Sequence, residues 1–270
     1  MAVTIGLVAQ LIEKIAPKSW AEDWDNVGLL VGSGSKPLER ILITLDGTLE
    51  VVEEAKNFGA QLIVAHHPII FRPLKNLRSD NAGALVPLRL LQHGIGYYAA
   101  HTNLDQSVFS ASRILGEILG LERMELLEGE ERGYGVCGYL PHPEKLRVLW
   151  KRFLEGLTKS GVYAQNYELS GVRLAGSLEK EVRKIAIVNG SGGRFVSNAL
   201  FKGADLLITG DVDHHSALDA LEGGMAIGDL GHFLSEAPML QKIFHYLTTQ
   251  KSLQGIEVKV SSINRSPWLV

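Results

Sequence analysis

The stretch Leu62-Ile63-Val64-Ala65-His66-His67-Pro68-Ile69-Ile70-Phe71 contains four apolar residues, followed by two histidines and a proline. The apolar run is short, uninterrupted and partly β-branched, which predicts a buried strand. Pro68 cannot continue a strand ladder and restricts the backbone before it, so the strand is expected to end at the histidines. In open α/β sheets, ligands bind beyond the carboxyl ends of the strands. His66 and His67 therefore indicate either metal ligands or a loop without chemistry.

The neighbouring segments predict a β-α-β unit around this strand. Residues 40–46 have the pattern of a strand, and the helix that follows ends at Gly59. Such a unit implies parallel strands joined by a right-handed crossover. Residues 94–100 predict a further strand. It runs into His101-Thr102-Asn103-Leu104-Asp105, a second polar group at a strand end.

The second half of the chain repeats this pattern weakly. Residues 184–190 resemble the strand that precedes Gly47, and residues 199–208 resemble residues 55–64. Where the first half has its histidine pair, the second half has Thr209-Gly210-Asp211. The repeat predicts an α/β fold made of two related α/β lobes.

The boundary between the lobes is expected in segment 121–134, which is acidic and punctuated by glycine and so has the composition of a linker. We therefore expect an N-terminal lobe of residues 1–125, with the C-terminal segment packed on it. Residues 126–270 would form the C-terminal lobe. The segment without a clear pattern, about 130 to 180, is too short for a large inserted domain.

Composition excludes several classes of protein. The 270 residues are 46% hydrophobic and 21% charged, and the net charge is −3 without a long basic run. Nucleic acid is not expected as a ligand, because phosphate binding needs a clustered basic face. The single cysteine, Cys137, excludes an intramolecular disulfide and a thiolate cluster. Because the N-terminus lacks the pattern of a signal peptide and no apolar run reaches ~18 residues, we expect a cytoplasmic protein without a membrane span.

A third polar group occurs at His232-Phe233-Leu234-Ser235-Glu236. His232 and Glu236 are four residues apart and so lie on one helical face, either as a metal chelate or as an exposed pair. Together with the two strand-end groups, they provide imidazoles and carboxylates for a two-metal site, in which a carboxylate joins the ions. Nitrogen and oxygen ligands favour Zn, Mn, Fe or Co.

Taken together, these motifs resemble the NIF-three-like family, also called the GTP cyclohydrolase I type 2 homologue family or the dinuclear-metal-centre hexameric proteins. The resemblance covers nearly the whole chain. It implies two α/β lobes with the metal site in the cleft between them. It also implies a toroidal homohexamer, a trimer of dimers, with the metals facing its inner cavity. The motifs, in family order, are Trp24-Asp25-Asn26-Val27-Gly28-Leu29, Leu45-Asp46, His66-His67-Pro68, His101-Thr102-Asn103-Leu104-Asp105, Thr209-Gly210-Asp211, and Gly231-His232 with Ser235-Glu236.

The resemblance also implies a ligand set for two divalent metal ions per chain. The implied ligands are His66, His67, Asp105, His232 and Glu236, with Glu236 bridging both ions. His66 and Asp105 are assigned to one ion, and His67 and His232 to the other. After Asp105, residues 106–110 stand where the family pattern often has a glycine-rich segment. This difference leaves the shape of the loop undetermined but does not affect Asp105 as an implied ligand.

Four further features have two interpretations each. His101 is expected to be catalytic, orienting a ligand or moving a proton, with direct metal ligation as the alternative. His215 is either a catalytic acid/base or substrate-binding group, or a helix-start residue without chemistry. The loop Gly190-Ser191-Gly192-Gly193 is either an anion site or a tight turn. Trp24-Asp25-Asn26 is either a turn anchored by a buried indole, or a site-facing acid and amide; Trp20 and Trp24 are expected to pack rather than to stack on a ligand.

Two functions of different class follow. The first is a cyclohydrolase-like, metal-dependent hydrolase, in which water activated by the two cations attacks an electrophilic carbon or phosphorus. Its small-molecule substrate is unknown, and the family name suggests a nucleotide-like or pterin-like ring. The second is a metal-handling or partner-binding hexameric scaffold without catalysis.

Overall fold

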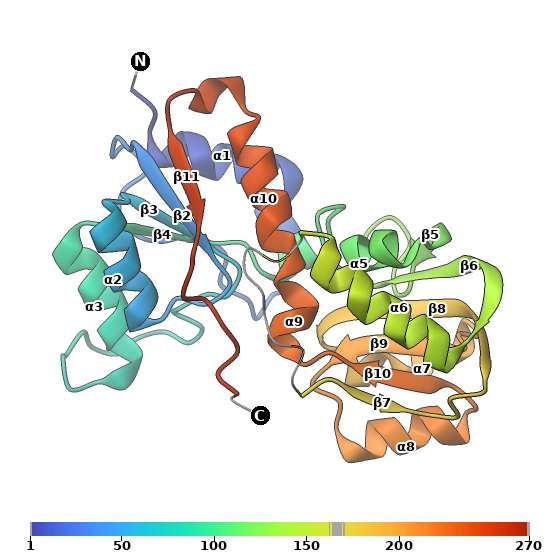
Figure 1. The fold of residues 1–270 in the computed structure, drawn as a ribbon. Helices are drawn as coiled ribbons and strands as arrows, with labels where there is room; N and C mark the ends of the chain where they lie inside the picture. Colours follow the sequence, from blue (N-terminus) through green and yellow to red (C-terminus); the bar gives the residue numbers. More distant parts are fainter. Residues whose placement is uncertain (1, 162, 164–168, 170, 269–270) are drawn as a thin grey trace. The chain divides into compact units, whose positions relative to one another are not determined.

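Two β-sheets organise the chain, each in its own compact unit. The structure is a computed structural model that describes residues 2–161, 163, 169 and 171–268. Unit 1 consists of Met1–Leu104 and Leu240–Asn264, and unit 2 of Asp105–Met239 with Arg265–Val270 (Figure 1). The predicted class, an α/β fold of two lobes, is confirmed.

The sheet of unit 1 has five strands in the order β1-β4-β3-β2-β11. Its three central strands are parallel, and β11 pairs parallel with β2 at one edge. The other edge strand, β1, is antiparallel to β4. The strands are β1 (Gly28–Val31), β2 (Arg40–Thr44), β3 (Leu62–Ala65), β4 (Gly96–Ala99) and β11 (Glu257–Val260).

Helices cover both faces of this sheet, with α2 and α3 on one face and α1 and α10 on the other (Figure 1). The expected cap of α2 is present: the hydroxyl of Thr48 accepts a hydrogen bond from the Val51 amide, and Gly59 ends the helix in the left-handed conformation. The Tyr246 hydroxyl donates to the Leu11 carbonyl and so joins α10 to α1. The helices are α1 (Ile5–Ile15), α2 (Leu49–Phe58), α3 (Leu85–His93), α4 (Thr102–Asp105) and α10 (Pro238–Thr248), with short 3-10 turns at Lys18–Trp20, Ala82–Ala84 and Lys251–Leu253.

The sheet of unit 2 has six strands in the order β5-β6-β8-β9-β10-β7. Strands β8, β9 and β10 are parallel, and antiparallel strands flank them on both sides. The strands are β5 (Glu122–Leu126), β6 (Val136–Lys145), β7 (Arg173–Ala175), β8 (Glu181–Ser191), β9 (Leu206–Gly210) and β10 (Ala226–Asp229).

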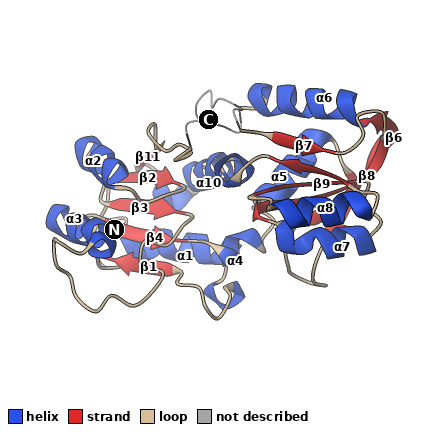
Figure 2. Ribbon diagram, turned by 90° about the horizontal axis from the view of Figure 1, so that it is seen from below, coloured by secondary structure: helices blue, strands red, loops and turns tan. Residues whose placement is uncertain are grey.

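Helices also cover both faces of the second sheet, with α7 and α8 on one face and α5 and α6 on the other (Figure 2). Alternate strand residues such as Leu207 and Ile227 pack with the apolar side of α7 in one buried core. On the opposite face, a Cβ at Gly228 would lie 2.5 Å from the Trp150 ring, so this glycine lets α6 approach β10 closely. The helices are α5 (Ala111–Leu119), α6 (Leu146–Lys159), α7 (Val196–Phe201), α8 (His214–Glu222) and α9 (His232–Glu236), with a 3-10 turn at Gly193–Phe195.

The weak sequence repeat corresponds to a repeat of topology. In unit 1, β2, α2, β3, α3 and β4 form consecutive parallel β-α-β units, and β8, α7, β9, α8 and β10 do the same in unit 2. In both units the polar groups of the sequence follow the carboxyl ends of these strands. This is where an open parallel sheet binds its ligands.

The segment between the units differs from the sequence prediction. Residues 121–134 were expected to form a linker, but residues 122–126 form β5 and pair antiparallel with β6. The chain passes from unit 1 to unit 2 at Leu104–Asp105 rather than at residue 125, and returns to unit 1 at Leu240. The strand was missed because β5 is a polar edge strand, and all five of its residues are exposed or only half-buried.

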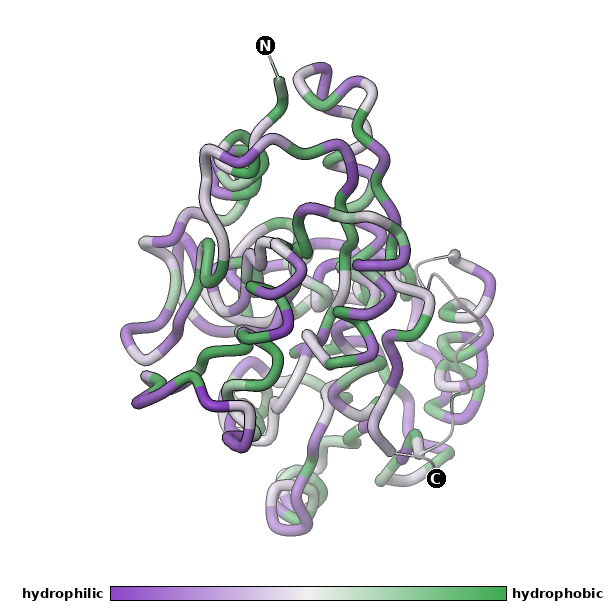
Figure 3. Tube along the Cα trace, turned by 90° about the vertical axis from the view of Figure 1, so that its left-hand side faces the viewer, coloured by the Kyte–Doolittle hydropathy of each residue, from purple (hydrophilic) through white to green (hydrophobic). Residues whose placement is uncertain are grey.

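Hydropathy varies over short distances along the chain (Figure 3). Among the residues that the structure describes, no helix has both the length and the apolar composition that a bilayer span requires.

Candidate metal centre

The histidine pair lies at the end of β3, as the sequence predicts. The backbone amides of His66 and His67 donate to the carbonyls of Thr44 and Leu45, so pairing with the β2 segment continues up to Pro68. His66 is buried, whereas the His67 side chain is about one-fifth exposed. Both imidazoles are therefore held by the edge of the sheet and not by a loose loop.

Three imidazoles of unit 1 converge at this edge. His66, His67 and His101 each offer a ligand atom, and these atoms lie within 4.8 Å of one another. The ring centroid of His66 is 4.9 Å from that of His67 and 5.1 Å from that of His101. This separation fits nitrogen donors that point at one cation, so His101 belongs to the same group as the histidine pair.

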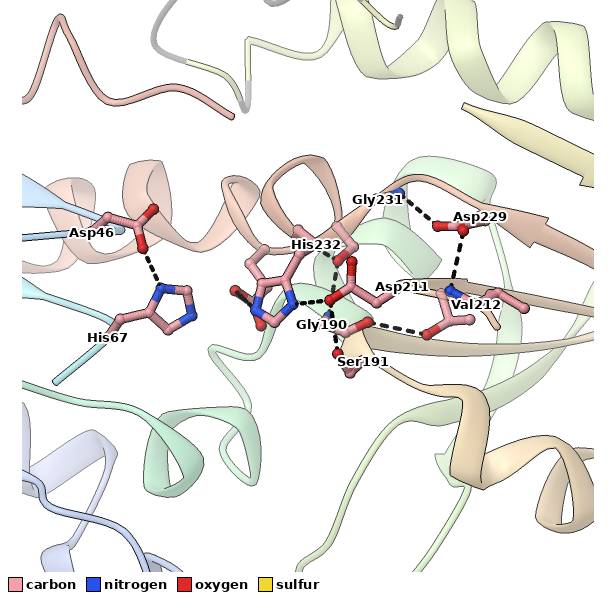
Figure 4. A network of polar contacts seen from close by, with 12 residues as sticks. Asp46, His67, Gly190, Ser191, Asp211, Val212, Asp229, Gly231 and His232 are labelled. Atoms are coloured by element: carbon pink, nitrogen blue, oxygen red, sulfur yellow. Dashed lines mark hydrogen bonds and ion pairs between the residues drawn. The ribbon is translucent and has the colours of Figure 1, made fainter. Parts of the chain in front are cut away.

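Each of these imidazoles is oriented by a hydrogen bond at Nδ1. His66 Nδ1 lies 2.8 Å from the Ala100 carbonyl oxygen, His67 Nδ1 lies 2.7 Å from Asp46 Oδ1, and His101 Nδ1 lies 2.9 Å from Asp25 Oδ1. Figure 4 shows the pair of His67 and Asp46. Because carbonyl and ionised carboxylate oxygens only accept, each Nδ1 donates, and in the neutral imidazole Nε2 is then the nitrogen that can bind a metal. This arrangement is typical of histidines that ligate metals.

Asp25 is the acid that holds His101. Its carboxylate is buried and also accepts hydrogen bonds from the Thr102 amide and hydroxyl, at 3.1 Å and 2.6 Å. Burial raises the pKa of Asp25, but the hydrogen bonds from His101 and Thr102 outweigh it and lower the pKa from 3.8 to about 2. Of the site-facing acid and amide that the sequence offered as one interpretation, the acid faces His101, whereas the Asn26 amide donates to the Ile70 carbonyl. The Trp24 indole, expected to be buried, is 57% exposed.

Two buried polar residues fix the backbone around this group. The Tyr97 hydroxyl on β4 donates to the His67 carbonyl at 2.8 Å. Asn103 accepts from the His101 amide at 2.9 Å and donates to the Ala16 carbonyl at 2.8 Å. Neither residue was assigned a role from sequence, where Tyr97 lies within the β4 segment and Asn103 lies two residues after His101.

Unit 2 contains its own imidazole–carboxylate group on α9. His232 Nε2 lies 3.2 Å from Glu236 Oε2, and the Glu236 residue is only 3% exposed. His232 Nδ1 lies 2.7 Å from Asp211 Oδ2, which also accepts from the Ser191 hydroxyl at 2.8 Å (Figure 4). The pattern at Nδ1 therefore matches that of the unit 1 histidines, and Asp211 orients His232 as Asp46 orients His67.

Asp211 adopts a backbone conformation that is unusual for a residue other than glycine. Its φ is +51°, in the left-handed region that aspartate tolerates better than most residues. This turn directly follows β9 and directs the carboxylate to His232. Such local strain concentrates at functional sites.

Asp105, the remaining predicted ligand, is held by a second polar network in unit 2. The Asn189 amide donates to Asp105 Oδ1 at 2.8 Å. Asn189 is in turn fixed by Ser112, whose hydroxyl donates to Asn189 Oδ1 at 2.7 Å and accepts from the Asn189 backbone amide. Asn189 was not singled out from sequence, where it appeared only as the polar end of a strand.

The glycine-rich segment Gly190-Ser191-Gly192-Gly193, which starts within the last two residues of β8, supports α9 rather than offering open amides. The Gly190 amide donates to the Ser235 hydroxyl at 2.9 Å, and the Gly192 amide donates to the Gly210 carbonyl. Gly190 has φ +66°, and a Cβ there would lie 2.4 Å from Glu236 Oε1. At these two amides the tight-turn interpretation is therefore the one that fits.

His215 lies on the first turn of α8 and is exposed. Its backbone amide donates to the Asp213 side chain, which caps the helix, and its ring contacts the ring of His214. Among the described residues, His215 does not belong to a cluster of potential metal ligands. Its catalytic role stays a prediction.

The strand-end imidazoles, each oriented at Nδ1, define the class: a two-unit α/β protein with histidine and carboxylate groups of the kind that bind divalent metals. The chain belongs to the Duf34/NIF3 (NGG1p interacting factor 3) family, whose model matches residues 3–267. The family resemblance drawn from the sequence motifs is confirmed.

Known proteins similar to this chain include relatives that carry the name "GTP cyclohydrolase 1 type 2 homolog". One from Clostridium perfringens is 38% identical over 87% of this chain and 88% of its own length. One from Halalkalibacterium halodurans is 28% identical, and the alignment covers 97% of both chains. That alignment has 363 positions against about 262 aligned residues here (97% of 270), so the relative has about 100 residues that this chain lacks.

A solved structure gives the same result for the fold. A hypothetical protein from Staphylococcus aureus has a TM-score of 0.87 and 27% identity, with 100% of both chains covered.

Proposed function

We propose that this protein binds divalent metal ions through its histidine and carboxylate groups and uses them to hydrolyse a small molecule. The observation that carries the proposal is the hydrogen bond at Nδ1 of His66, His67, His101 and His232. A histidine that served only to pack in the core would not need an acceptor at Nδ1, whereas a metal-binding histidine needs one to fix the orientation of its ring.

The donor set fits a first-row divalent ion such as Zn, Fe, Mn or Co, because it consists of imidazole nitrogens and carboxylate oxygens without a thiolate. In unit 1, His66 and His67 would hold metal. In unit 2, Asp105, His232 and Glu236 would do so. Two ions per chain and the bridging role of Glu236 are implied by the family resemblance, and metal stoichiometry tests both.

When bound, the ions would supply Lewis-acid activation of water and stabilisation of developing negative charge. The protein's own contribution is to orient the imidazoles and to move protons. His101 is the proposed proton carrier, because the buried Asp25 carboxylate behind it accepts from Nδ1 and orients the ring, as the aspartate of a catalytic triad does. The relatives' name suggests that the bond broken lies in a nucleotide-like ring.

The test of hydrolysis uses protein stripped of metal and reloaded separately with Zn²⁺, Fe²⁺, Mn²⁺ and Co²⁺. Each form is assayed on GTP, on cyclic amidines and on phosphoesters, beside Glu236→Gln, which keeps the size of the buried side chain. Turnover by the wild type that is lost in Glu236→Gln supports the hydrolase. Metal uptake without turnover above that variant on any of these substrates favours the second function, a metal-handling or partner-binding scaffold.

A second measurement separates the two roles of His101. If His101 carries protons, His101→Gln keeps the metal content and lowers turnover. If His101 is a ligand, the same substitution lowers the metal content.

A further inference from the structure

Two aromatic side chains of unit 1 are exposed side by side. Trp24 is 57% exposed and Phe71 is 50% exposed, and their ring centroids lie 5.6 Å apart with the planes tilted by 51°. Exposed large apolar side chains that lie next to one another mark binding sites more often than isolated ones do. The tilted, half-exposed rings leave aromatic surface uncovered.

The backbone holds this pair in place. Asp25 turns inward to His101 and Thr102, so its neighbour Trp24 turns outward. The Asn26 side-chain amide donates to the Ile70 carbonyl and thereby ties the loop of Trp24 to the segment that carries Phe71. Trp24 is therefore next to the hydrogen-bonded Asp25, and Phe71 is next to the hydrogen-bonded Ile70. These neighbours hold both aromatic residues in place.

The pair lies beside the three-histidine group. The Trp24 ring centroid is 6.1 Å from that of His101, with the rings at 75° in an edge contact. The ring centroid of His101 is in turn 5.5 Å from that of His67. A molecule resting on Trp24 and Phe71 would thus extend toward the Nε2 atoms that the proposed function assigns to metal binding and proton transfer.

We infer that Trp24 and Phe71 form a binding surface for a planar heteroaromatic ring of the substrate. The inference deepens the proposed function and rests on it, because it takes the bound ring to be part of the hydrolase substrate. A flat ring fits because it can stack on an aromatic side chain without needing polar contacts. Stacking on one aromatic side chain is worth about 1–3 kcal/mol. The position beside His101 favours a small molecule over a second copy of the chain as the occupant.

The experiment measures binding of guanosine and pterin by isothermal titration calorimetry, with D-ribose as a probe that lacks the ring. The zinc-loaded full-length protein is compared with Trp24→Ala, Phe71→Ala and the conservative Trp24→Phe. Trp268→Ala and Phe201→Ala are matched controls, because these side chains are 79% and 92% exposed elsewhere on the chain. Zinc content and molecular mass are measured for every variant.

We expect guanosine or pterin to bind and ribose not to bind. Trp24→Ala and Phe71→Ala should each weaken ring binding about 5- to 150-fold, which is the stacking energy converted to a ratio, while zinc content stays unchanged. Trp24→Phe should keep most of the affinity, and the two controls all of it.

Three results would overturn the inference: no binding of either ring, equal binding of ring and ribose, or ring binding unchanged in both alanine variants. A change of molecular mass in those variants with unchanged ring binding would assign the surface to a contact between copies of the chain. Titrating guanosine and pterin into the metal-free protein measures ring binding without turnover, and so separates this inference from the proposed function. Ring binding without any turnover defeats only the hydrolase, and turnover without ring binding on these residues defeats only the aromatic surface.

Discussion

Asp46 illustrates how single residues prepare the metal group. It follows β2, whereas the histidine pair follows β3, the next strand along the chain. Its carboxylate lies 2.7 Å from His67 Nδ1. The bond selects one tautomer of the imidazole and one ring orientation. Asp25 and Asp211 do the same for His101 and His232. Three acids without a predicted ligand role therefore decide where the ligand atoms point.

Asp46→Ala is expected to weaken zinc binding about 10- to 100-fold, because His67 loses the acceptor that orients it. The zinc dissociation constant is measured by competition with a chromophoric chelator. Asp80→Ala is the control, since Asp80 is an exposed acid of the same unit that pairs only with Arg78 in the described contacts. Zinc constants that agree within twofold for wild type and Asp46→Ala would contradict this role.

At the scale of elements, the end of β8 positions α9. Gly190 is the buried next-to-last residue of β8, donates to Ser235, and leaves space for the Glu236 carboxylate. Its positive φ and its close neighbour both require a residue without a side chain. The position of the buried glutamate thus depends on a glycine that is 46 residues earlier in the chain.

Gly190→Ala should destabilise the protein and lower its metal content, because the new Cβ would lie 2.4 Å from Glu236 Oε1. Gly203→Ala is the matched control: Gly203 has φ +69°, and a Cβ there would meet no atom within 4 Å, so it shares only the backbone strain of about 1–2 kcal/mol. Urea unfolding and bound zinc are measured for both. Equal zinc content in the two variants would argue against contact between Gly190 and Glu236.

A second junction of elements, between α2 and the C-terminal segment, depends on Glu54. This carboxylate is about one-tenth exposed and accepts hydrogen bonds from Ser261, Ser262 and Lys259. Burial raises the pKa of Glu54, but these hydrogen bonds outweigh it and lower the pKa below its ordinary value of 4.5. The junction therefore holds the end of β11 to α2 while Glu54 is ionised.

Glu54→Gln should reduce the free energy of unfolding at pH 7 and make that free energy depend less on pH in the acid range. Since the folded pKa is lowered, the contribution of Glu54 is complete above about pH 4.5, the unfolded value, and disappears as the pH falls through the folded value. Urea unfolding between pH 7 and pH 3 measures this, with the exposed Glu39→Gln as control. Parallel pH profiles for wild type and Glu54→Gln would contradict the assignment.

For the whole molecule, the resemblance to hexameric proteins gives the expected assembly. Six chains of 29.5 kDa make a particle of about 177 kDa. Light scattering coupled to size-exclusion chromatography should find this mass, and dilution should reveal dimers if the hexamer is a trimer of dimers. A single species at the mass of one chain at all concentrations would exclude the homohexamer.

The sequence alone determined the α/β class, the repeat and the position of the histidine pair, because hydrophobic runs, caps and Pro68 act locally. It also placed His232 and Glu236 on one helical face, as α9 confirms. The polar edge strand β5 and the passage between units at Leu104–Asp105 escaped it, since their signals are weak or non-local.

Only the tertiary structure decided which side chains hold the ligands. Asp25 reaches His101 across 76 residues, and Asn189 reaches Asp105 across 84. No period or spacing in the sequence predicts such pairs, because they depend on how strands far apart in the chain are ordered in a sheet. The same holds for Trp24, whose exposure follows from the buried contacts of its neighbour Asp25.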